Sequence, residues 1–169
     1  MDKLYFDFSG GATKESILAQ LIAACDNEYH HRAYDDVKDI LANFAISDGA
    51  RKLANDVYSV LARAESSVHG MSLDETHVHE VGNTDALVHI LTSCVLMDKL
   101  SPASVTANPM ALGSGTIICA HGELPVPAPA TAKILETLPD GAYHGGGEGE
   151  LTTPTGAAMA AAFVTDWEI

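Results

Sequence analysis

Two histidines, a glutamate and an aspartate lie within the ten positions of the segment THVHEVGNTD, residues 76–85. If residues 76–80 are extended, His77 and His79 project from the same face, because side chains alternate along a strand. Such a pair can offer two imidazoles to one metal ion, although two histidines do not complete a coordination sphere. The candidates for the remaining ligands are His30, His31, Glu80, Asp85 and His121. The alternative is a pair of exposed or hydrogen-bonded histidines at the end of a strand.

Asp85 has a structural interpretation of its own. It falls in the first turn of an apolar segment that predicts a helix from about Thr84 to Leu100. A carboxylate is favoured there by the helix dipole and by the free N–H groups of the first turn. Asn83 and Thr84 can cap the same helix end, so capping and catalysis both remain open for these residues.

His121 precedes a segment, AHGELPVPAPAT (120–131), in which prolines stand at 125, 127 and 129. Three prolines restrict the backbone and remove three N–H donors, which predicts a rigid extended segment. His121 would then be held in a fixed position, as a metal ligand or a general base requires. PVPAP also resembles a peptide-recognition ligand, but an interior segment of one domain is a poor candidate for that role.

Two glycine-rich segments are candidates for contact with a ligand. LGSGT (112–116) matches neither a P-loop nor a dinucleotide-binding fingerprint, so a tight turn between strands is favoured over anion binding. GGGEGELTTPTG (145–156) combines glycines, which allow close approach of backbone to a ligand, with a helix start that can receive an anion. The alternative for the second segment is a mobile surface loop that ends in a capped helix.

The elements that must position these residues follow from periodicity. Residues 3–9 predict a short buried strand, and apolar residues at helical spacing predict helices around 17–25, 37–44 and 53–64. SVTANP and GTIICA read as strands, Pro127 and Pro129 precede a helix through Leu138, and Thr153 with Pro154 begins a last helix. The prediction is a single mixed α/β domain over residues 1–169, a short sheet packed with about five or six helices. We expect the long helix at 84–100 to be buried on several sides.

Composition restricts the class of function. The chain has 23 acidic and 9 basic side chains and a net charge of −14, which disfavours nucleic-acid binding and attracts cations. Cys25, Cys94 and Cys119 lack CxxC spacing and indicate reduced thiols in a cytoplasmic protein. We expect neither a signal peptide nor a membrane span.

Several segments carry a family resemblance. The chain resembles the LarC nickel-insertion proteins in HVHEVGNTDALVHI (77–90), ALGSGTIICAHGELPVPAPAT (111–131) and GELTTPTGAA (149–158). FDFSG (6–10) and YHHRAYDDVKDIL (29–41) are weaker matches, and together these segments span nearly the whole chain in the family's order. The resemblance is to the N-terminal portion of the family, and we expect the C-terminal portion associated with nucleotide binding to be supplied from elsewhere.

The resemblance implies a role in making the nickel-pincer nucleotide cofactor of lactate racemase. Family members insert nickel into pyridinium-3,5-bisthiocarboxylic acid mononucleotide as CTP-dependent cyclometallases of the lyase class. It implies Ni(II) ligands at His77, His79 and His121, and imidazole suits this ion. It also implies catalytic roles for His79, Glu80, Asp85 and His121. The residues expected to contact the precursor are Ser114, Gly115, Gly147, Glu150, Thr153, Thr155 and Gly156.

Departures from the family pattern leave an alternative open. The family continues Gly-Asp-Met where this chain has Thr13, Lys14 and Glu15, and it commonly has an aspartate where His89 stands. We expect a separate C-terminal polypeptide to complete the activity, and self-association into a homo-oligomer is a further expectation. The alternative is a divergent scaffold, or a metal-binding or ligand-binding module, that kept the fold and lost insertion chemistry.

Overall fold

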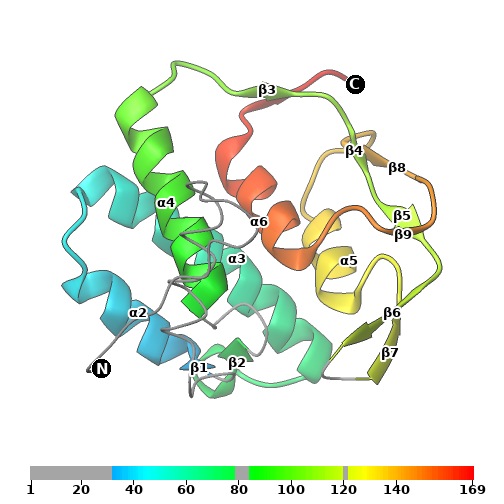
Figure 1. The fold of residues 1–169 in the computed structure, drawn as a ribbon, viewed down its shortest axis with the longest axis horizontal. Coiled ribbons are helices and arrows are strands. Elements are labelled where there is room, and N and C mark those ends of the chain that lie inside the picture. Colours follow the sequence, from blue (N-terminus) through cyan, green and yellow to red (C-terminus); the bar gives the residue numbers. More distant parts are fainter. Residues whose placement is uncertain (1–31, 79–83, 120–121) are drawn as a thin grey trace, which may run out of the picture.

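The computed structural model describes residues 32–78, 84–119 and 122–169 (Figure 1). The strand predicted over residues 3–9 and the helix predicted around 17–25 lie outside these ranges. The helices are α2 (Tyr34–Asn43), α3 (Asp48–His69), the short 3₁₀ helix η1 (Leu73–Glu75), α4 (Thr84–Leu100), α5 (Pro129–Leu135) and α6 (Pro154–Phe163). The strands are β1 (Arg32–Ala33), β2 (His77–Val78), β3 (Thr106–Ala107), β4 (Met110–Ala111), β5 (Gly113–Ser114), β6 (Thr116–Cys119), β7 (Gly122–Pro125), β8 (Tyr143–His144), β9 (Gly149–Glu150) and β10 (Asp166–Trp167).

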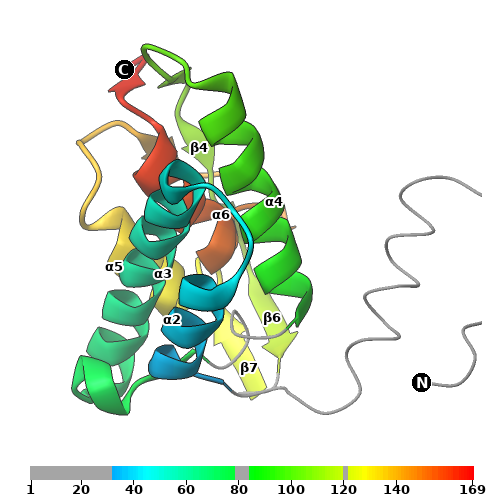
Figure 2. The same ribbon diagram turned by 90° about the vertical axis from the view of Figure 1, so that its left-hand side faces the viewer.

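Helix α3 is the centre of the helical layer and contacts α2, α4, α5 and α6 (Figures 1 and 2). The Ser47 hydroxyl caps its N-terminus by accepting a hydrogen bond from the Ala50 N–H at 3.3 Å. Gly70 ends it in the left-handed conformation that glycine adopts without steric cost. Tyr58 and Leu61 on its inner face are fully buried. The helix therefore supplies a fixed axis against which the other helices pack.

Helix α4 begins and ends at the predicted residues, but its predicted burial on several sides is wrong. Ile90, Leu91 and Cys94 face the core, whereas Leu96 is 54% exposed and Leu100 is 76% exposed. Among the described elements, the helix contacts α3 and α6. An apolar composition therefore gave the right element with the wrong number of buried faces.

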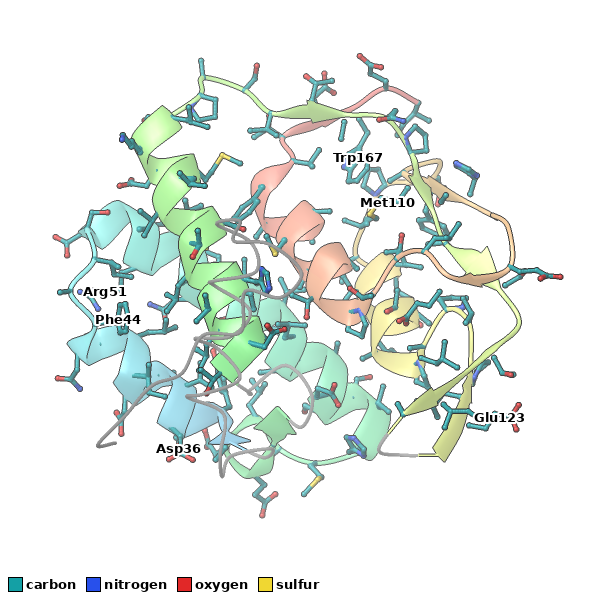
Figure 3. The ribbon with its side chains drawn as sticks, in the orientation of Figure 1. Asp36, Phe44, Arg51, Met110, Glu123 and Trp167 are labelled. Atoms are coloured by element: carbon teal, nitrogen blue, oxygen red, sulfur yellow. The ribbon has the colours of Figure 1, made fainter. Side chains whose placement is uncertain are left out.

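Phe44 is the last apolar residue of the spacing that predicts a helix around 37–44, but it lies outside this helix and outside the core. Helix α2 ends at Asn43, and the Phe44 side chain is 51% exposed. Its carbonyl accepts a hydrogen bond from Arg51 Nη2 at 2.9 Å, and Figure 3 shows the two residues together at the outer edge of the molecule. The buried stripe of α2 is instead formed by Val37 and Leu41.

The strands confirm the mixed α/β class. Within the described residues they pair as two-stranded ribbons, β1 with β2, β3 with β10, β4 with β8, β5 with β9, and β6 with β7. The predicted strands in SVTANP and GTIICA are β3 and β6. Ribbons β4–β8 and β5–β9 lie beside α5, and the hairpin β6–β7 lies below them in Figure 1. None of the described helices is long and apolar enough to cross a membrane.

Candidate functional site

The two glycine-rich segments come together although 28 residues, 117–144, separate them in sequence. In the antiparallel pair β5–β9, Gly113 is opposite Glu150 and Ser114 is opposite Gly149. The Ser114 hydroxyl donates a hydrogen bond to the Gly147 carbonyl at 3.0 Å. The ribbon therefore gathers four of the residues predicted to contact the precursor into one cluster: Ser114, Gly115, Gly147 and Glu150.

Close backbone packing explains part of the glycine content of this cluster. A Cβ atom at Gly113 would lie 1.9 Å from the carbonyl oxygen of Gly149, and Gly113 has a φ of +89°. A Cβ atom at Gly146 would lie 2.8 Å from the Gly113 nitrogen. Gly146 and the pair Gly149–Glu150 are thus packed closely on the backbone of Gly113 and Ser114.

The N-terminus of α6 follows directly from this cluster. Thr153 is its N-cap, as predicted, and the Thr153 hydroxyl accepts a hydrogen bond from the Gly156 N–H at 3.2 Å. The Thr152 hydroxyl donates to the Ala111 carbonyl at 2.7 Å, which ties the helix start to β4. Thr155 is half-buried in the first turn. The partial positive charge of a helix N-terminus makes this turn suited to an anion such as phosphate.

The predicted metal and catalytic residues are described only in part. His77 lies in β2, opposite Ala33 of β1. Asp85 is in the first turn of α4, and its Oδ1 lies 3.4 Å from His89 Nε2. Both of these side chains are more than half exposed. His30, His31, His79, Glu80 and His121 lie outside the described residues, so the predicted ligand set stays a prediction.

Strand β2, the first turn of α4 and the hairpin β6–β7 lie toward the lower end of the molecule in Figure 1. The C-terminus of α3 lies at this same end, and the chain continues from it through η1 to β2. Helix α3 contacts β2 directly. The segments that carry or flank the predicted histidines are therefore placed at one end of the helical layer, away from β3 and β10.

Within residues 32–78, 84–119 and 122–169, no group of three or more His, Cys, Asp or Glu side chains is arranged to hold a metal ion. Cys94 is fully buried, and burial raises the pKa of its thiol to about 11, with a smaller contribution from the charge of Asp56. A metal binds the thiolate, so a thiol that stays protonated at neutral pH is a poor ligand.

One acid–histidine pair in the structure was not among the residues predicted from the sequence. Glu65 and His69 stand four residues apart in the last turns of α3, with Glu65 Oε2 3.3 Å from His69 Nε2. Both line a recess of about 120 Å³ together with Leu124, Pro129 and Pro154. The i, i+4 spacing of Glu and His was the available signal in the sequence, while the recess depends on packing between distant segments.

Thr131 is a second residue that the sequence did not single out. It is fully buried in α5, within the proline-rich segment, and its hydroxyl has no hydrogen-bond partner among the described residues. A buried hydroxyl without a partner costs roughly 1–3 kcal/mol. No signal in the sequence separates this threonine from an ordinary residue of a helix start.

Comparison with known proteins identifies the family. The profile of the family described as nickel insertion protein matches residues 9–168. The pyridinium-3,5-bisthiocarboxylic acid mononucleotide nickel insertion protein of Akkermansia muciniphila is 40% identical over 137 residues, covering 79% of this chain and 32% of that protein. The protein of the same description from Staphylococcus saprophyticus is 35% identical over 140 residues, covering 83% of this chain and 35% of that protein. No solved structure matches the chain significantly.

The matched segment spans about a third of the length of these curated relatives. The match nevertheless covers most of the present chain, including strand β2, the glycine-rich ribbon β5–β9 and the capped start of α6. The sequence segments that resemble LarC proteins are therefore part of a continuous similarity, and the chain belongs to the nickel insertion protein family.

Proposed function

We propose that this chain takes part in nickel-pincer cofactor biosynthesis by holding nickel and a pyridinium-3,5-bisthiocarboxylic acid mononucleotide for metallation. Family membership and the description of the relatives support this proposal. The structural observation that carries it is the joining of the ribbon β5–β9 to the N-terminus of α6. The start of α6 offers the positive end of its helix dipole to the phosphate of the mononucleotide, and Ser114 and the neighbouring glycines offer backbone surface.

Nickel is the cargo of the proposed reaction, and His77, His79 and His121 are its proposed ligands. Forming a nickel–carbon bond at the ring releases the proton of the replaced C–H bond, which a base must accept. We assign this proton transfer and the orientation of the precursor to His79, Glu80, Asp85 and His121 as a group. Neutral imidazoles are suitable both as Ni(II) ligands and as proton acceptors.

The proposal includes a second polypeptide that supplies the CTP-dependent part of the reaction. The chain spans only about a third of its relatives, and the family's nucleotide-binding portion is expected beyond the matched region. The proposed activity as a lyase-class cyclometallase therefore belongs to the assembled pair.

The test is an insertion assay with tag-free chain, precursor, nickel and CTP, with and without a candidate C-terminal polypeptide. Mass spectrometry detects product as the precursor mass with nickel added and protons lost, in the nickel isotope pattern. We expect product only with both polypeptides, and loss of at least tenfold in rate for the His77→Ala/His79→Ala variant. His144→Ala, which removes an exposed histidine of β8, is the matched control.

The alternative is a divergent module that binds metal or ligand without insertion chemistry. Lys14, where the family has an aspartate, is the observation that favours it. Absence of product with every candidate C-terminal polypeptide, from a chain that still binds nickel, would establish this alternative. Equal rates for the wild type and the double histidine variant would remove the nickel role of that pair while leaving the family's reaction in place.

A further inference from the structure

We propose that Glu65 and His69 form a binding site for a divalent metal ion, Ni²⁺ in the proposed reaction, at the rim of the recess between α3, β7, α5 and α6. The two side chains lie on successive turns of the same face of α3. Their facing atoms, Glu65 Oε2 and His69 Nε2, are 3.3 Å apart. The assignment of nickel rests on the proposed function, whereas the metal site itself rests on the geometry.

The distance between the two donor atoms fits a shared ion. Two ligands at about 2.1 Å from one metal, with bonds at right angles, lie about 3.0 Å from each other. The observed 3.3 Å is within a small side-chain adjustment of that value. It is longer than the roughly 2.7–2.9 Å of a charge-assisted hydrogen bond. The pair is therefore spaced at least as well for a metal as for an ion pair with each other.

The position of the pair on its helix favours a cation. His69 is the last residue of α3, a helix of 22 residues, and the C-terminal end of a helix carries a partial negative charge. The Glu65 side chain is only 14% exposed and that of His69 is 33% exposed, so solvent screens a bound ion incompletely. The net charge of −14 adds a favourable potential over the whole surface.

Asp85 and His89 provide an internal comparison. They have the same i, i+4 spacing, and their facing atoms are 3.4 Å apart. Their side chains are 55% and 63% exposed, and they lie in the first turns of α4, where the helix dipole disfavours a cation. Similar local geometry at the opposite end of a helix therefore makes a weaker cation site.

The recess beside Glu65 and His69 indicates transfer of the ion rather than permanent retention. Leu124, Ala128, Pro129 and Pro154 give it apolar walls, and its volume is about 120 Å³. A cavity of about 150 Å³ holds benzene, so this recess is on the scale of one six-membered ring. Two protein ligands leave several coordination positions open, and open positions are what a second ligand needs in order to take the metal. Pro154 also starts α6, so the recess adjoins the proposed phosphate site.

The experiment is a titration of tag-free, ¹⁵N-labelled chain with NiCl₂, followed residue by residue in amide NMR spectra. Paramagnetic Ni²⁺ broadens the signals of residues close to it, and Zn²⁺ serves as the diamagnetic reference. We expect broadening at the last turn of α3 and at residues 124–130. In His69→Gln and in Glu65→Gln, the Ni²⁺ concentration for half-broadening of these signals should rise about tenfold, which corresponds to 1.4 kcal/mol.

Matched controls are His144→Gln and Glu136→Gln, which remove an exposed imidazole and an exposed carboxylate elsewhere. In both control variants, the Ni²⁺ concentration for half-broadening of the signals at the recess should equal that of the wild type. The broadening map of the wild type needs no variant, so loss of folding in a variant cannot hide the answer. Thermal unfolding by circular dichroism identifies any variant whose midpoint reflects unfolding.

Three results overturn the inference: no broadening at the recess, broadening there that both substitutions leave unchanged, or equal effects of the control substitutions. Broadening confined to the residues around His77 would overturn this site while leaving the proposed nickel chemistry intact. Broadening at the recess without product in the insertion assay would support the metal site and contradict the proposed function. Failure of the metal site at Glu65 and His69 can therefore be distinguished from failure of the proposed function.

Discussion

Gly113 is the residue whose type the structure explains most directly. Its φ of +89° is costly for other residues, and an added Cβ would meet the Gly149 carbonyl oxygen at 1.9 Å. Gly115 also has a positive φ, +94°, but a Cβ there would enter open space. We expect Gly113→Ala to lower the free energy of unfolding by about 2–4 kcal/mol and Gly115→Ala by about 1 kcal/mol, measured by urea denaturation. Equal losses would mean that β5 and β9 are not in contact as described.

Single residues were predicted well where their role is local. Thr153 was predicted as an N-cap because it directly precedes Pro154. Threonine is preferred at the N-cap and proline at the first helical position, and both preferences act within one turn of chain. Glu65 and His69 were not predicted, because an acid–histidine pair at helical spacing is common on solvated faces. What distinguishes this pair is the recess beside it, which forms only when Leu124 and Pro154 pack against the end of α3.

At the scale of elements, α4 offers a test of which face is packed. Leu91 is 7% exposed and Leu96 is 54% exposed, one and a half turns further along. We expect Leu91→Ala to lower the free energy of unfolding by about 2–5 kcal/mol and Leu96→Ala by less than about 0.5 kcal/mol. Chemical denaturation of the two variants side by side provides the measurement. A loss above about 1 kcal/mol for Leu96→Ala would show that residues outside the described ranges cover this face.

The helices could be predicted from the sequence, whereas the strand pairing could not. The bounds of α4 follow from the apolar composition of residues 84–100, which is a local signal. Ribbons such as β4–β8 and β3–β10 contain two residues per strand and join segments that are distant in sequence. Such short strands carry too little alternation to define a partner, so tertiary packing decides their pairing. The number of buried faces of α4 was also decided by tertiary packing, so its composition did not predict it.

At the scale of the whole molecule, charge links the composition to the proposed role. The net charge of −14 comes from side chains that are mostly on the surface, where they raise the local concentration of cations. This potential supports capture of a divalent ion but does not choose its site. The choice depends on local geometry, which is why the end of α3 and the start of α4 differ as cation sites despite similar side chains.

The same charge has a cost that salt should reveal. Like charges repel in the compact state, so raising NaCl from about 20 mM to about 200 mM should stabilise the fold by screening. For a chain of this size, about 1 kcal/mol corresponds to about 2–4 °C in the melting temperature, which circular dichroism can measure. Replacing the exposed acidic residues Asp74, Asp140 and Glu168 by lysine changes the net charge from −14 to −8, since each change adds two units. The salt effect should shrink in this variant. An unchanged or larger effect would mean that salt acts through something other than relief of self-repulsion.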